Sequence, residues 1–590
     1  MARRYANPLA GLITGVRFAV KSLEPSLMPR SAIDQGIIMG GSFLTGFLAG
    51  STAGLIVTTA PIPGSGRALR IAGVLAASAR SADSLRAHDP TAPPPVDESE
   101  AWAEVGSEVL SSLALAGIAS KKAPPVTQVA TLAAVAASTG IDAQGALELR
   151  SDTPDAAYLA TSVGVAAALN AGVASLVGIV RLGGFGMRKM VRRTGVTGSA
   201  ATLIGSIATI AALVVGVKAA AKVGLGKIAA GNRATEIAYA TAPEPSSVSG
   251  SKFSLAAYET LGLQGRRLVS EVTSPEAIQE VMGVKPTHDP IRVYVGLGTA
   301  DTEDDRIEVA IQELKRTGGF DRSLIIAASP AGTGYVNYIA AEAAELMALG
   351  DVATVAVQYG EVPSMLSITK VGDAARVYAA LVTRLRAEVD ALDRPIRIAA
   401  YGESLGAITC QMGVLEASES STNLIVDDAL WVGTPQGSEL FEGLTSDGTP
   451  VFDQFDDVVA YLEAGSDVPD VFFLNHDNDP VTKFNLSIAY EMPEWLKTAS
   501  RGRGMDPHQR WLPGIAFWQG LIDTKNAATV VPGEFFSTGH DYRADLAQFV
   551  RAAYGFSDTT DEQMVQIEAR LRQSEIDRAA NIDQGRLQTA

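Results

Sequence analysis

The pattern of apolar and polar residues divides the chain into two parts. Three long stretches in the first part contain no charged residue: Gln35 to Gly66, Ala156 to Val180 and Thr194 to Val217. Each is long enough for a helix that crosses a bilayer, which needs about 20 predominantly apolar residues. Buried core helices rich in Ala and Gly are the alternative, but three such stretches lie close together. The pattern therefore predicts an all-α, multi-span transmembrane domain over residues 1–240.

Two weaker apolar regions accompany these stretches. Val109 to Ser120 and Ala123 to Ile141 are separated by two lysines and two prolines, which is compatible with two short spans, re-entrant segments or one hairpin. Basic residues between the second and third strong stretches favour a cytoplasmic loop there, whereas basic residues just after the third favour the opposite orientation. We therefore expect a multi-pass plasma-membrane protein and leave the side of the C-terminal part open.

After the linker-like segment Thr241 to Ser251, strand and helix patterns alternate. Residues 241–290 are expected to hold a linker and amphipathic connecting helices, and residues 557–590 a charged C-terminal helix or tail. Between them, residues 291–556 predict an α/β domain with a mostly parallel sheet, because helices separate successive strands. The expected strands are Ile291–Val295, Leu324–Ala328, Ala353–Gln358, Ile396–Ala400, Ala429–Val432 and Val471–Leu474.

Charge and cysteine content exclude several classes of function. The net charge is −17, and the acidity is concentrated after residue 250, where 27 Lys and Arg face 50 Asp and Glu. Nucleic-acid binding is therefore not expected, because it requires concentrated positive charge. The single cysteine, Cys410, excludes an intrachain disulfide and a cysteine-based metal cluster. Nothing in the sequence implies a metal or an organic cofactor.

The strongest chemical signal is Gly402-Glu403-Ser404-Leu405-Gly406, a G-x-S-x-G pattern between an expected strand and an expected helix. In that position a serine lies on a sharp turn and its hydroxyl projects from the end of the strand. The pattern is short, and a chance match is the alternative. Its position between strand and helix favours a nucleophile elbow, with Ser404 as the nucleophile.

A serine nucleophile needs a base and an acid that orients the base. His540, in a late glycine-containing loop, is the expected base, because it follows the last expected strand in the chain order of α/β-hydrolases. Asp479, just after the strand Val471–Leu474, is the preferred acid, and Asp477 in the same loop is the alternative. A turn that only caps the strand would explain these two aspartates equally simply.

Acyl transfer also requires hydrogen-bond donors for an oxyanion. The backbone N–H of Leu405, directly after the nucleophile, is one expected donor. The other is expected from the glycine-rich loop that follows the strand Leu324–Ala328, where Ala331, Gly332 and Thr333 are candidates. An ordinary strand-to-helix loop is the alternative explanation for these glycines.

An insert over residues 484–530 separates the expected acid from the expected base. It contains three of the five tryptophans, interleaved with arginines. Aromatic rings beside cations suit a lipid headgroup boundary or a lid over an acyl-binding cleft. A packed subdomain with solvated arginines is an equally simple explanation.

Together these stretches resemble the actinobacterial membrane-embedded α/β-hydrolase family, in which several transmembrane helices precede a serine-hydrolase domain. The resemblance is carried by short segments spread over nearly the whole chain: PSLMPR at 25–30, QGR at 264–266, VYVGL at 293–297, PAGTGYV at 330–336, GESLG at 402–406, DPV at 479–481 and GHDYR at 539–543. It implies Ser404, Asp479 and His540 as nucleophile, acid and base. Tyr335 replaces the family's usual Trp.

The sequence thus predicts a membrane-anchored serine hydrolase that is esterase- or lipase-like and forms an acyl-enzyme with an apolar ester, for which a lipid is the favoured class. Its expected partners are the lipid bilayer and that lipid or acyl-ester substrate. An acyltransferase with the same triad and a non-catalytic binding or gating module are the two alternatives. The sequence leaves the oligomeric state open.

Overall fold

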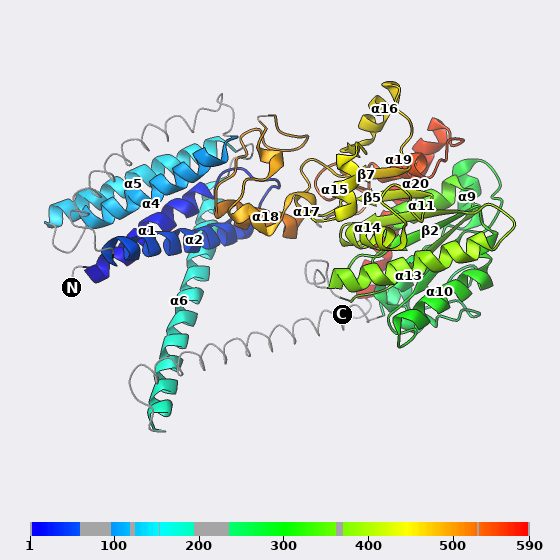
Figure 1. Cartoon of the computed structure of the whole chain (residues 1–590), viewed down its shortest axis with the longest axis horizontal. Coiled ribbons are helices and arrows are strands. Elements are labelled where there is room, and N and C mark those ends of the chain that lie inside the picture. The colour runs from blue at the N-terminus through cyan, green and yellow to red at the C-terminus, as the bar shows by residue number, and fades with distance from the viewer. Residues whose placement is uncertain are drawn as a thin grey trace. The chain divides into compact units, whose positions relative to one another are not determined.

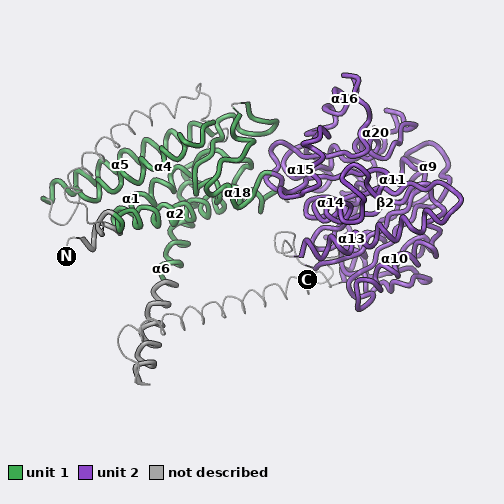
Figure 2. Tube along the Cα trace, viewed as in Figure 1, with its two compact units in different colours: residues 1–219, 483–527 green, residues 220–482, 528–590 purple. Residues whose placement is uncertain are grey.

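The computed structural model describes residues 3–59, 96–118, 124–150, 152, 154–193, 235–361, 370–498, 500–527 and 530–587. The chain forms two compact units (Figure 2). Unit 1 comprises Met1–Ala219 and Lys483–Ala527, and unit 2 comprises Ala220–Thr482 and Ala528–Ala590. The insert between the expected acid and base therefore groups with the N-terminal helices rather than with the sheet.

Unit 2 is built on a seven-stranded sheet in which all strands are parallel, in the order β1-β3-β2-β4-β5-β7-β6. The strands are β1 Ile291–Val295, β2 Leu324–Ser329, β3 Val352–Val357, β4 Arg397–Glu403, β5 Asp428–Val432, β6 Val451–Phe452 and β7 Val471–Leu474. Strand β4, which leads into the G-x-S-x-G turn, occupies the middle of the sheet. The expected parallel α/β architecture is present.

Helices cover both faces of this sheet (Figure 1). Alternate residues of each strand point to opposite faces, so that Val293 packs with one cluster of helices and Tyr294 with the other. One face carries α10 Glu303–Thr317, α13 Val371–Asp390, α14 Leu405–Ala417 and α15 Glu439–Ser446. The other carries α8 Gly262–Ser270, α9 Pro275–Met282, α11 Tyr338–Met347, α19 Leu546–Ala553 and α20 Asp561–Leu587.

Short elements complete unit 2. They are η1 Ile237–Tyr239, η2 Tyr258–Thr260, η3 Gly319–Asp321, α16 Phe455–Glu463 and α17 Pro480–Lys483, the last of which ends at the boundary with unit 1. Helix α20 belongs to the segment expected to be a charged surface helix. One side of it is buried through Met564, Ile567 and Leu571, so this tail contributes to the core as well as to the surface.

Unit 1 is helical. Its long helices are α1 Arg3–Lys21, α2 Ala32–Thr59, α4 Glu98–Ile118, α5 Pro125–Glu148 and α6 Ala156–Arg193. In the described part of the chain two helical stretches are long and apolar enough to cross a membrane, Ala32–Ile56 and Ala156–Ser175. They coincide with two of the three strong apolar stretches of the sequence. The third, Thr194 to Val217, lies outside the described residues, and the weaker pair forms the separate helices α4 and α5.

Unit 1 buries charged side chains between its helices. Arg17 and Glu108 are 2% and 0% exposed, and Arg17 Nη1 lies 3.4 Å from Glu108 Oε2 and 2.6 Å from the Ser111 hydroxyl. Lys21 pairs with Glu104 in the same region. Large apolar side chains are also exposed on the helices of this unit, and more than half of the residue surface is exposed at Leu48, Leu55, Ile56, Val126, Val129 and Val163.

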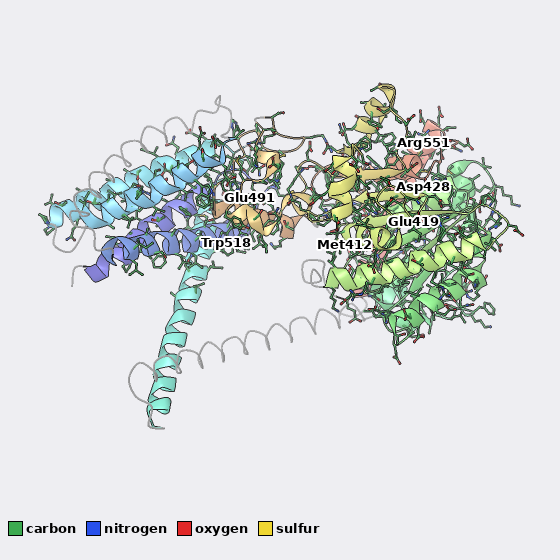
Figure 3. The ribbon with its side chains drawn as sticks, in the orientation of Figure 1. Met412, Glu419, Asp428, Glu491, Trp518 and Arg551 are labelled. Atoms are coloured by element: carbon green, nitrogen blue, oxygen red, sulfur yellow. The ribbon has the colours of Figure 1, made fainter. Side chains whose placement is uncertain are left out.

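The insert packs on these helices through buried polar contacts. It contains η5 Leu486–Ala489, η6 Glu494–Leu496 and α18 Ile515–Asn526. Arg510 forms ion pairs at 2.6 Å with both Glu24 and Glu104. Trp518, labelled in Figure 3, lies on α18. Its indole N–H donates to the Thr45 hydroxyl at 3.0 Å. The insert is therefore a packed part of unit 1, and Arg510 is buried in ion pairs rather than solvated.

A fully buried ion pair joins the sheet of unit 2 to the helix layer above it. Arg292 on β1 and Glu345 on α11 are both 0% exposed and make two bonds, at 2.5 Å and 2.8 Å. The hydroxyl and backbone N–H of Thr273 also donate to Glu345. Such a pair contributes little net stability compared with apolar residues, but removal of one member leaves the other charge buried and unpaired.

We predict that Glu345→Ala lowers the free energy of unfolding of unit 2 by about 3–5 kcal/mol, because the guanidinium of Arg292 then lacks its counter-charge. Denaturant unfolding of the detergent-solubilised protein, followed through Trp431 in strand β5, measures this loss. Glu308→Ala is the matched control, since its ion pair with Arg384 is about half exposed and is worth at most about 1 kcal/mol. Equal effects of the two substitutions would contradict the prediction.

Candidate functional site

Ser404 lies at a sharp turn between strand β4 and helix α14. Its φ of 56° is in the left-handed region, which a residue with a Cβ atom adopts only at a cost of about 1–3 kcal/mol. The backbone N–H of Ser404 donates to the Val432 carbonyl at 2.9 Å, so strand β5 holds the turn in place. Strain of this kind is concentrated at functional sites, and here it lies at the residue expected to be the nucleophile.

The two glycines of the G-x-S-x-G turn are required by close backbone contacts. A Cβ atom on Gly402 would lie 2.6 Å from the Gly406 carbonyl oxygen, and one on Gly406 would lie 2.4 Å from the Ser329 carbonyl oxygen. These distances are shorter than any normal carbon–oxygen contact. The second contact brings the N-terminus of α14 against the end of β2, where the glycine-rich loop begins.

The structure brings Asp479 and His540 together. His540 Nδ1 lies 2.7 Å from Asp479 Oδ2, and Asp479 itself is fully buried at the start of α17. The same oxygen accepts the Tyr542 hydroxyl at 2.5 Å, and the other carboxylate oxygen accepts the Val481 N–H at 2.8 Å. The backbone N–H of Asp477, the alternative acid, donates to Asp453 Oδ1 at 2.6 Å.

The ring of His540 lies beside the end of β5, the strand whose Val432 carbonyl accepts the Ser404 N–H. A Cβ atom on Gly433, the residue after β5, would lie 2.8 Å from His540 Cε1. With Nδ1 directed at Asp479, the Nε2 atom remains as the proton acceptor. In the described part of the chain the Ser404 hydroxyl makes no hydrogen bond, and contacts of this kind often tighten only when substrate is bound.

Carboxylates around His540 control its protonation. Burial lowers the pKa of His540, but the Asp479 carboxylate, together with the charge of Glu403, outweighs burial and leaves this pKa above its ordinary value of 6.5. Glu403, the residue before the nucleophile, is itself held by the Asn337 amide at 2.7 Å and the Tyr401 hydroxyl at 2.8 Å. The base therefore works in a strongly negative environment.

The structure leaves some of the expected oxyanion donors available and uses one of them in another hydrogen bond. Leu405 is the first residue of α14, where backbone N–H groups have no acceptor within the helix and the helix dipole favours negative charge. The N–H of Ala331 donates to the Tyr335 carbonyl at 2.8 Å and is therefore used within its own loop. Gly332 and Thr333 are the candidates that remain in this loop.

Sequence reasoning gave no role to three residues that shape the site. Tyr542 bonds Asp479, Glu403 raises the pKa of His540, and Asn337 holds Glu403. Tyr542 lies in the conspicuous GHDYR segment, and Glu403 in the turn itself, so both were visible as neighbours of candidate residues. No sequence signal indicated that Asn337, which caps α11, would reach the turn. Among the described residues no group of three or more His, Cys, Asp or Glu could hold a metal ion.

Comparison with known proteins gives one match. No curated protein and no solved structure matches the chain significantly. Residues 291–567 match the model of the family described as Alpha/beta-hydrolase family, which identifies this part of the chain as an α/β-hydrolase domain.

Proposed function

We propose that unit 2 is a serine hydrolase in which Ser404 is the nucleophile, His540 the general base and Asp479 the acid that orients the base. The observation that carries this proposal is the buried His540–Asp479 pair beside the strained turn of Ser404. In the first step the Ser404 hydroxyl attacks an ester carbonyl while His540 takes its proton. The N–H groups of Leu405 and of the Gly332–Thr333 segment stabilise the oxyanion.

In the second step His540 donates the proton to the leaving alcohol, and an acyl-enzyme on Ser404 remains. Water, activated by His540, then attacks the acyl-enzyme and releases the acid. An alcohol acceptor at the same position would give acyl transfer instead. The choice between these outcomes is made by whichever nucleophile reaches the acyl-enzyme, and product analysis with candidate acceptors distinguishes them.

We further propose that unit 1 anchors the enzyme in a membrane and that the substrate is a lipid or other apolar ester. Two features support the anchor: stretches 32–56 and 156–175 are apolar enough to span, and large apolar side chains of these helices are exposed while Arg17 and Glu108 are paired inside. An enzyme held at a bilayer meets lipid esters at high local concentration. This argument favours a lipid over a soluble ester.

A fluorophosphonate probe tests the nucleophile. We expect stoichiometric labelling of the detergent-purified protein at Ser404, none in Ser404→Ala, and a rate about three orders of magnitude lower in His540→Ala, because the hydroxyl loses its base. Ser420→Ala, an exposed serine in the loop after α14, is the matched control and should label as the wild type does. Folded wild-type protein that stays unlabelled would favour the binding or gating alternative.

The pH dependence of labelling tests the pair of acid and base. His540 accepts a proton only when neutral, so the rate should rise with pH, with a midpoint above 6.5 because the carboxylates raise the pKa of His540. Asp479→Asn removes the main opposing charge and should move the midpoint to lower pH while it lowers the maximal rate by about two to four orders of magnitude. Asp477→Asn should change neither quantity. If Asp477→Asn instead lowered the midpoint and the maximal rate while Asp479→Asn changed neither, Asp477 would be the acid.

The membrane anchor has its own test. The full-length protein should remain in the membrane fraction after an alkaline carbonate wash, and its release into the supernatant would contradict the proposal. Val163→Lys places a charge on an outward, apolar position of α6 and should lower the membrane-retained fraction, since a lysine at the centre of a span costs about 3 kcal/mol. Val468→Lys, at an equally exposed position in unit 2, is the matched control and should leave retention unchanged.

A further inference from the structure

Two histidine–aspartate contacts join two loops at the carboxyl end of the sheet. We call residues 475–479, which follow β7, the acid loop, and residues 537–545, which precede α19, the base loop. Asp479 of the acid loop contacts His540 of the base loop, and Asp545 of the base loop contacts His476 of the acid loop. Each loop therefore supplies one imidazole and one carboxylate, and only the first of these two pairs belongs to the proposed triad.

Both ring nitrogens of His476 lie close to oxygen atoms of the base loop. The ring is 0% exposed, with Nδ1 at 2.9 Å from the Gly539 carbonyl oxygen and Nε2 at 3.3 Å from Asp545 Oδ2. A carbonyl oxygen can only accept a hydrogen bond. Burial raises the pKa of Asp545, but hydrogen bonds from His476 and Ser537 outweigh it and hold this pKa below its ordinary value. The Asp545 carboxylate also accepts hydrogen bonds, so each ring nitrogen of His476 faces an acceptor.

Aromatic stacking connects His476 to the proposed acid, Asp479. The rings of His476 and Tyr542 lie 4.1 Å apart at an interplanar angle of 25°, a geometry in which an aromatic face stabilises a cation. The hydroxyl of Tyr542 accepts the backbone N–H of His476 at 3.2 Å and donates to Asp479 at 2.5 Å. One residue of the acid loop thus orients the tyrosine that bonds the catalytic carboxylate.

The contacts of the acid loop also fix the base loop on both sides of His540. His476 reaches Gly539 before the base and Asp545 after it. Asn478 adds two bonds to the first side: its amide donates to the Thr538 hydroxyl at 2.7 Å, and its carbonyl accepts the Gly539 N–H at 2.8 Å. The backbone that carries His540 is therefore held before and after the base by one short segment.

We propose that His476 is a positioning residue for the proposed serine hydrolase: as a buried, doubly protonated imidazolium it clamps the base loop and keeps His540 within reach of Ser404. This inference rests on the proposed function, since it concerns the same base. His476 neither touches the nucleophile nor transfers a proton in the reaction. Its effect reaches the reacting atoms through the backbone of the base loop and through Tyr542.

Labelling kinetics with the fluorophosphonate probe test the clamp. His476→Gln keeps a side chain of similar length with one N–H donor but loses the charge and the second donor. We expect its saturating rate of labelling at Ser404 to fall about 10- to 100-fold, the cost of a base misplaced by about 1 Å, with the half-saturating probe concentration unchanged. His288→Gln is the matched control, because this histidine is 44% exposed and its ring faces Asp351, away from both loops.

The protonation state provides a readout that does not depend on the variant. In the wild-type protein labelled with ¹⁵N-histidine, one ring should show both N–H signals, slow to exchange with solvent. It is assigned by its loss in His476→Gln or, if that variant does not fold, by elimination with single substitutions of the other four histidines. A ring of His476 with only one N–H would overturn the inference.

The outcomes separate the two proposals. A wild-type protein that is not labelled at all refutes the proposed function, while the histidine signals still report on the clamp. Labelling of His476→Gln at the wild-type rate, in a protein whose wild type reacts at Ser404, refutes the positioning role and leaves the proposed triad intact. A reduced rate together with the doubly protonated ring supports both.

Discussion

A buried carboxylate is the constraint on which the candidate site depends. Asp479 has no exposed surface, and an ionised carboxylate in such a place is costly unless donors surround it. Three donors do so, from His540, Tyr542 and Val481. Two of them come from the base loop, so the hydrogen bonds that satisfy this buried carboxylate also hold the base loop against it. The requirement to satisfy one buried carboxylate thus fixes where His540 lies.

Chain connectivity gives this constraint a second consequence. The chain leaves unit 2 after Thr482, just beyond the acid, and returns at Ala528, ahead of the base. The insert between these two points is held in unit 1 by the ion pairs of Arg510 and the hydrogen bond of Trp518. Asp479 and His540 therefore lie on the two segments that connect the sheet to the helical unit. Contacts between the acid loop and the base loop bring these two segments together within unit 2, although the whole insert separates them in the sequence.

The sequence predicted the parallel sheet well, because apolar strands and amphipathic helices alternate clearly after residue 290. Strands β1 and β7 begin and end where the pattern placed them, and β2, β3, β4 and β5 differ by a few residues at their ends. Strand β6 was missed since two residues carry no periodicity. The proposed nucleophile and base follow from local patterns. The choice between Asp477 and Asp479 does not, because both follow the same strand, and only contacts with the distant base loop distinguish them.

The ion-pair partners of Arg510 and His476 could not be predicted either, because they are distant in the sequence and meet only in the folded chain. The arginines of the insert resembled a solvated or headgroup-facing set, yet Arg510 meets Glu24 and Glu104, whose roles as counter-charges are invisible without the fold. Likewise the sequence shows His476 beside the candidate acid, where it is a less favoured candidate for the base. Its pairing with Asp545 arises only when β7 and α19 come together.

The arrangement of charge fits the direction in which a proton would move. Carboxylates of Asp479, Glu403 and Asp541 raise the pKa of His540 and favour its protonated form, which the proposed attack creates. The N-terminus of α14, where Leu405 begins the helix, offers positive potential where negative charge would develop on the substrate. The contact of His476 with Asp545 joins the acid loop to the base loop without involving any of these three carboxylates. Positioning and electrostatics are in this way assigned to separate residues of the same two loops.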